Sequence, residues 1–202
     1  VFRRFVAKNV EALRAEANLW ASCGRVFYIY GQNKRAVEWL ADWQLRQGLS
    51  QWMTANLVLS LWNLNKYDDI CHVAKLSLEV IPDHSASIHR VFLAASLVLQ
   101  DRARESEEHF PHIDQQQLSP AFRAIGMLAK ATAELLCQPE NRSCSMRHCR
   151  SKLLNALGTE ASQLKTAGMV PQAYHEFLKL LAKKRGRWFH VAWYTFWQIR
   201  LG

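Results

Sequence analysis

The chain has 202 residues, of which 50% are hydrophobic and 21% are charged, so it can bury a core and does not have the composition of a disordered segment. No stretch of about 18 residues is both apolar and uncharged, which excludes a conventional membrane-spanning helix. Residues 1–140 contain 15 basic and 15 acidic residues, whereas residues 141–202 contain 11 basic and 2 acidic ones. The net charge of +9 therefore lies entirely at the C-terminal end.

Helical periodicity runs through most of the chain. Apolar residues recur at steps of three and four in residues 10–20, 36–43 and 73–80, and no alternating strand pattern of any length occurs. Turn-forming residues separate segments of about 12 to 18 residues, the length of a helix of three to five turns. These breaks are Gly31-Gln32-Asn33, Gln47-Gly48, Asn65-Lys66, Pro82-Asp83, Ser119-Pro120, Pro139-Glu140 and Gly168. The sequence predicts an all-α fold.

One segment suggests a repeat. Tyr67 begins a helix with Asp68 and Asp69 in its first turn, where the helix dipole favours acids, and Pro82 ends it. This segment resembles the second helix of a tetratricopeptide repeat (TPR), a helix–turn–helix unit of 34 residues. In the register that it sets, residues 17–50 match the family pattern at Trp20, Gly24, Phe27, Gly31 and Ala36.

The same register gives units at 17–50, 51–84, 85–118 and 119–152, with a further unit displaced by one residue at 154–187. Arg104 occupies a small-residue position in window 85–118, and in window 119–152 only Phe122 and Gly126 fit, so that unit is degenerate. The resemblance implies a right-handed α-solenoid of antiparallel helix pairs. We expect a helix over 1–16 before the repeats and an aromatic capping helix over 188–202. Because the chain starts at Val1, we expect a fragment or domain of a longer protein.

In this family the first helices of the units line a concave groove. By resemblance, the groove residues here are Arg25, Tyr28, Trp52, Asn56, Trp62 and Arg90. Aromatic anchors beside hydrogen-bonding groups suit a peptide. The lysine positions of the carboxylate clamp of some members hold Ala21 and Ala86, so the full clamp is absent. The alternative is that the two tryptophans pack in the core and the two arginines are solvated.

The C-terminal end combines cations with tryptophans. The candidate surface comprises Lys183, Lys184, Arg185, Arg187, Trp188, Trp193 and Trp197. This combination suits an anionic membrane surface, a nucleic acid or a partner protein. The alternative is a helix that covers the open end of the repeat stack.

The five cysteines are an odd number, scattered through the chain, which favours a reducing cytoplasm over a disulfide scaffold. Four residues of zinc-binding type fall close together, but their spacing matches no known zinc motif, so we favour free thiols and leave metal binding open. These residues are Cys137, Cys144, His148 and Cys149. No phosphate-binding loop, metalloprotease motif or nucleophile elbow is present, so we expect neither a cofactor nor an enzyme.

We therefore expect a non-catalytic scaffold. It would bind a peptide or protein partner in its groove or at its C-terminal face, and so assemble or regulate a complex. Two alternatives remain. One is binding of nucleic acid or an anionic membrane surface through the basic, aromatic C-terminus. The other is the regulatory domain of a larger enzyme whose activity lies in another domain.

Overall fold

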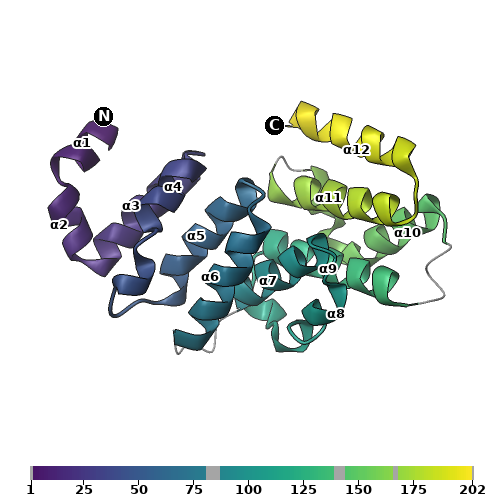
Figure 1. The fold of residues 1–202 in the computed structure, drawn as a ribbon, viewed down its shortest axis with the longest axis horizontal. Coiled ribbons are helices and arrows are strands. Elements are labelled where there is room, and N and C mark those ends of the chain that lie inside the picture. Colours follow the sequence, from purple (N-terminus) through teal and green to yellow (C-terminus); the bar gives the residue numbers. More distant parts are fainter. Residues whose placement is uncertain (1, 81–86, 139–143, 166–167, 202) are drawn as a thin grey trace. The chain divides into compact units, whose positions relative to one another are not determined.

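The computed structural model describes residues 2–80, 87–138, 144–165 and 168–201 (Figure 1). These ranges contain helices and their connections and no strand, which confirms the predicted all-α class. The chain divides into two compact units, Val1–His89 and Arg90–Gly202. Each unit is described by itself.

The first unit consists mainly of short and medium helices. They are α1 (Phe2–Lys8), α2 (Val10–Ala15), α3 (Ala17–Ile29), α4 (Asn33–Leu40), the single turn η1 (Trp43–Leu45), α5 (Gln51–Asn63) and α6 (Tyr67–Val80). Helix α3 packs against α4, and α5 packs against α6 as well as against both members of the first pair (Figure 1). The expected helix over 1–16 is divided at Asn9, whose side-chain amide donates to the Phe5 carbonyl at 2.8 Å.

The same hydrogen-bonded turn reverses the chain between α3 and α4 and between α5 and α6. Its central residue, Gly31 in one case and Asn65 in the other, has a positive φ of 68° and 56°, respectively. The N–H of this residue donates to the carbonyl three residues back, and the next N–H donates to the carbonyl five residues back, with distances of 2.8 to 3.0 Å. This is the Schellman arrangement, which favours glycine or asparagine. The two turn residues are 34 positions apart, which is the period expected from the sequence.

The second unit is built around its longest helix, α9. Its elements are α7 (Ser87–Leu99), which begins in the last residues of the first unit, α8 (Ala103–Ser106), η2 (Phe110–His112), η3 (Gln115–Gln117), α9 (Pro120–Cys137), α10 (Met146–Leu157), η5 (Gly158–Lys165), α11 (Met169–Lys184) and α12 (Trp188–Leu201). Helix α9 contacts α8, α10, α11 and η5, and α12 packs along α11. Arg123 of α9 donates to Glu160 of η5 through Nη2 and Nε at 2.8 and 2.9 Å, which ties η5 to the longest helix.

The expected repeat units coincide with helix pairs to different degrees. Windows 17–50 and 51–84 contain α3/α4 and α5/α6. Window 85–118 contains α7, but only the four-residue α8 and two single turns follow it. Pro111 lacks an N–H, and the Asp114 carboxylate accepts from the Gln116 N–H at 2.9 Å, so this segment favours local turns over a continuous helix. Helix α10 crosses the boundary between windows 119–152 and 154–187.

Two indoles join α3 to α4 by donating to each other's backbone. Trp20 Nε1 donates to the Trp39 carbonyl at 3.1 Å, and Trp39 Nε1 donates to the Trp20 carbonyl at 2.8 Å. Both side chains are buried, so each hydrogen bond satisfies an N–H that has little access to water. The pair therefore fixes the register between these two helices.

Asp42 adds ion pairs to this junction of α3 and α4. Its Oδ1 accepts from Trp20 Nε1 at 3.0 Å, and its Oδ2 lies 3.0 Å from Arg14 Nη1 and 2.7 Å from Arg46 Nη2. The two cations also lie over indole rings, Arg46 at 4.4 Å from the Trp20 centroid and Arg14 at 4.7 Å from that of Trp39. Burial by itself raises the pKa of the Asp42 carboxyl, but the hydrogen bond and charge of Arg46, with Arg14 and Trp20, outweigh it and lower the pKa.

We predict that Asp42→Asn lowers the free energy of unfolding by about 1–2 kcal/mol at pH 7, because the arginines and Trp20 lose their charged acceptor. The folded-state pKa of Asp42 is lowered, so its contribution is complete above the unfolded value of about 4 and is lost as pH falls through the folded value. Urea denaturation of both proteins at pH 7 and at pH 2.5 measures this difference. An undiminished difference at the lower pH would contradict the assignment.

Gly24 lies in the same helix junction, and a Cβ at this position would be 2.5 Å from Leu40 Cδ2. Leu40 is itself buried, so its side chain has no room to move away. We predict that Gly24→Ala destabilises the protein by about 1–2 kcal/mol, because overpacking exceeds the gain in helix propensity. The matched control is Gly126→Ala in α9, where the nearest atom, Val91 Cγ2, is 3.4 Å away and the substitution should be neutral or stabilising by up to about 1 kcal/mol. Thermal denaturation of both variants checks this prediction, and equal losses would refute it.

Candidate functional site

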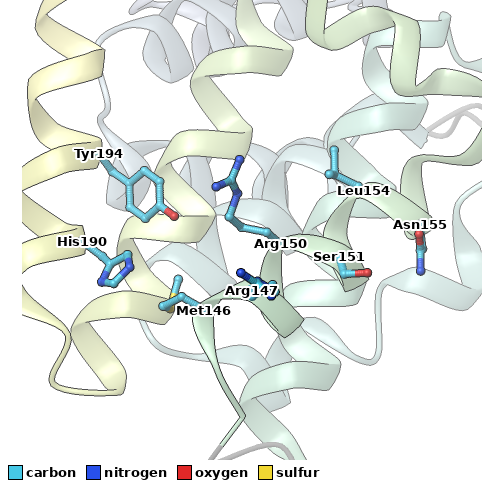
Figure 2. A pocket seen from close by; sticks show the side chains of 8 residues that line it. All are labelled: Met146, Arg147, Arg150, Ser151, Leu154, Asn155, His190 and Tyr194. Atoms are coloured by element: carbon cyan, nitrogen blue, oxygen red, sulfur yellow. The ribbon is translucent and has the colours of Figure 1, made fainter.

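A pocket of about 430 Å³ lies between α10 and α12 in the second unit (Figure 2). Its lining combines cationic, hydrogen-bonding and apolar side chains. Helix α10 contributes Met146, Arg147, Arg150, Ser151, Leu154 and Asn155, and α12 contributes His190 and Tyr194. The pocket therefore combines positive charge with hydrogen-bonding groups and a small apolar area.

The spacing of the lining residues explains why they share one surface. On α10 they occur as adjacent pairs at intervals of four, which places them along one side of a helix. Cys149, Leu153 and Leu157, which also recur every four positions, are buried along the adjacent side of α10, and Met146 is both buried and part of the lining. Ser145 caps the helix, since its Oγ accepts from the His148 N–H at 3.2 Å. Burial of one side of α10 thus leaves its arginines on the side that faces the pocket.

The arginines of the pocket have no acidic partner in the described part of the chain. Neither Arg147 nor Arg150 forms an ion pair with any described carboxylate. In Figure 2 the hydroxyl of Tyr194 is directed toward the Arg150 side chain. Two guanidinium groups beside hydroxyl and amide groups can hold a carboxylate or a phosphate.

Two aromatic groups at the pocket, Tyr194 in its lining and His175 beside Tyr194, carry no charge at neutral pH. Tyr194 is buried, and burial raises the pKa of its hydroxyl although the nearby Arg150 opposes this shift. His175 of α11 lies with its ring centroid 6.2 Å from that of Tyr194. Burial, and then the charge of Arg150, lower the pKa of His175, while Glu176 raises it. His175 is therefore neutral at pH 7, and Arg147 and Arg150 supply the positive charge.

An apolar surface adjoins the pocket. Phe189 and Trp193 of α12 are 79% and 51% exposed, and each directly precedes a residue that lines the pocket, His190 or Tyr194. Aromatic side chains next to arginines are common at the centres of protein interfaces.

The expected groove residues have different environments in the first unit. Arg25 is exposed on α3, and Tyr28 is half-buried, which raises the pKa of its hydroxyl. Trp52 of α5 is 40% exposed. Asn56 is buried, and its Nδ2 donates to the Trp52 carbonyl at 2.8 Å, so this amide is already bonded to its own helix.

The remaining two expected groove residues are Trp62 and Arg90. Trp62 is 1% exposed and packs edge-on against Tyr67, with ring centroids 5.6 Å apart, so it belongs to the core. Arg90 is half-buried on α7 and belongs to the second unit. Of the six, Arg25 and Trp52 are the ones that the structure leaves exposed, and both lie in the first unit.

The expected basic and aromatic surface is also divided. Lys183 and Arg187 are exposed, whereas Lys184 forms an ion pair with Asp101. Arg185 donates to the Leu135 carbonyl at 3.4 Å and lies 3.3 Å from Cys144 Sγ. Trp193 is half exposed, and the side chains of Trp188 and Trp197 lie outside the described part of the structure.

The structure shows no set of zinc ligands among the described residues of the cysteine-rich segment. Within the described ranges, no group of three or more His, Cys, Asp and Glu side chains is placed to hold a metal. Cys144 and Cys149 approach each other with their sulfurs 3.4 Å apart.

Arg147, Arg150 and Tyr194 are not among the site residues expected from the sequence. The signal on α10 is the recurrence of polar or basic residues three or four positions apart, at Arg147, Arg150-Ser151 and Asn155. Helix α12 brings Tyr194 to the pocket because it packs along α11. No local sequence pattern predicts this packing.

No family model, curated protein or solved structure matches this chain. Among the described helices, none is both long enough and apolar enough to cross a lipid bilayer.

We predict that His175 destabilises the fold in mild acid. Because its folded-state pKa is lowered, the unfolded chain binds the proton more readily, and stability falls as pH decreases below the unfolded value of about 6.5. His175→Phe should reduce the loss of thermal stability between pH 7.5 and 5.5. The control is His112→Gln, a substitution of an exposed histidine in η2, which should leave the wild-type pH dependence in place. The prediction fails if both variants retain the full dependence.

Proposed function

We propose that this chain is a non-catalytic binding module that holds an acidic segment of a protein partner at its C-terminal face, and so assembles or regulates a complex. The observation that carries the proposal is the pair Arg147 and Arg150 in one pocket without an acidic partner in the described chain. A TPR-like solenoid as the scaffold is part of the proposal. The 34-residue separation of the turns at Gly31 and Asn65 supports it.

A protein segment suits the pocket better than a nucleic acid. The lining includes the apolar Met146 and Leu154, and two exposed aromatic residues follow on α12. A nucleic acid is held mainly by a track of cations along its phosphates. In residues 183–187 such a track is interrupted, because Lys184 pairs with Asp101 and Arg185 contacts the Leu135 carbonyl.

A peptide probe tests this function. We expect a fluorescent peptide of alternating Glu and Leu to bind, and its Gln/Leu analogue to bind much more weakly. Arg150→Gln should weaken binding of the acidic peptide about tenfold, the effect of losing a hydrogen bond to a charged group. Lys152→Gln is the matched control, because it removes one positive charge from the same helix at an exposed position outside the pocket. Fluorescence anisotropy measures both affinities.

The outcome separates the alternatives. Equal losses in the two variants would show that general charge attraction, not the pocket, holds the peptide. A single-stranded oligonucleotide and vesicles with anionic lipid serve as further probes. Preferential binding of either, with a steep decrease as salt increases, would replace the proposed function by the corresponding alternative.

A further inference from the structure

We propose that Cys144 and Cys149 form a redox modification site, at which a peroxide converts the two thiols into a reversible intramolecular disulfide. Both cysteines are free, and their Sγ atoms are 3.4 Å apart. The inference goes beyond the proposed partner binding and does not depend on it.

The start of α10 brings the two sulfurs together. Cys144 directly precedes the capping residue Ser145, and Cys149 lies in the following helix, where its N–H donates to the Ser145 carbonyl at 3.0 Å. A disulfide requires the sulfurs to approach to about 2.05 Å, which is a movement of about 1.4 Å from the present separation. Cys144 lies outside the helix, so this movement does not require a change in α10.

The two thiols differ in their exposure and charge environment. Cys149 is fully buried, and burial, together with the hydrogen bond to Cys144, raises the pKa of its thiol to about 11 although Arg185 opposes the shift. Cys144 is partly exposed, and Arg185 Nη2 lies 3.3 Å from its sulfur. A negative charge that forms on Cys144 is compensated by this guanidinium group. Cys144 is therefore the sulfur that reacts with the oxidant, and Cys149 is the resolving thiol.

The reaction balances with hydrogen peroxide as the oxidant. The Cys144 thiolate attacks one peroxide oxygen, the O–O bond breaks, and the departing hydroxide takes up the thiol proton to give water and a sulfenic acid. The Cys149 sulfur then attacks the Cys144 sulfur, the S–O bond breaks, and the Cys149 proton leaves with the hydroxide as a second water. Two thiols lose two electrons in total, and one peroxide is reduced to two waters.

The disulfide would constrain the part of the chain that carries the pocket arginines. Arg147 lies between the two cysteines, and Arg150 directly follows the second. The closed loop restricts the unfolded chain, so we expect the melting temperature of the oxidised protein to be about 5 °C higher than that of the reduced protein.

Tryptic mapping tests the site in the unaltered chain. Trypsin cleaves after Arg142, Arg147 and Arg150, so a disulfide joins fragment 143–147 to fragment 148–150. After treatment with hydrogen peroxide and alkylation of the remaining thiols, mass spectrometry without reductant should find the joined fragments, lighter by two hydrogen atoms than their sum. Dithiothreitol should release them.

Three variants identify the roles of the sulfurs. Cys149→Ser should leave a sulfenic acid on Cys144 that dimedone traps, and Cys144→Ser should prevent both products. The control Cys137→Ser, which changes the other cysteine nearest in sequence, should still give the joined fragments. Oxidation that spares this pair, a bridge from Cys137 in its place, or no oxidation at all would overturn the proposal.

Discussion

At four helix ends of the described chain, the direction of the next helix depends on one backbone feature, a hydrogen-bonded turn that needs a residue with positive φ. It occurs at Gly31 and Asn65 in the first unit and at Asp101 and Gly186 in the second. Because each turn closes a helix within three residues, the next helix must begin beside the last one. The indole junction of α3 and α4 and the packing of α12 along α11 both follow from such a turn.

In the second unit some of the basic residues are paired within the fold and others are available to a ligand. Lys184 and Arg185 lie at the end of α11, where Asp101 and the Leu135 carbonyl accept from them. The arginines of α10 are exposed beside its buried residues and have no such partner among the described residues. Some of the positive charge at the C-terminal end is thus bonded within the protein, and some of it lines the pocket (Figure 2).

The sequence predicts the class of the fold and the 34-residue spacing of two turns in the first unit, but little of the site. Helical periodicity and the breaks at Gly31 and Asn65 are local signals, and the structure has helix ends at both places. The turn at Asp101 is harder to predict, because aspartate adopts positive φ only occasionally. Trp52 and Trp62 are equivalent in the sequence pattern, yet the packing of Trp62 against Tyr67 buries one and leaves the other exposed. The pocket needs α12 placed beside α10, which no local pattern specifies.

Asp101 contributes to the fold through both its backbone and its side chain. Its backbone adopts the conformation that glycine would adopt more easily, while its carboxylate pairs with Lys184 on a helix that lies 83 residues further along the chain. Glycine at this position would preserve the bend and break the electrostatic link, and asparagine would do much the same. The bend alone therefore limits this position to residues that tolerate positive φ, and the pairing with the lysine additionally requires an acid.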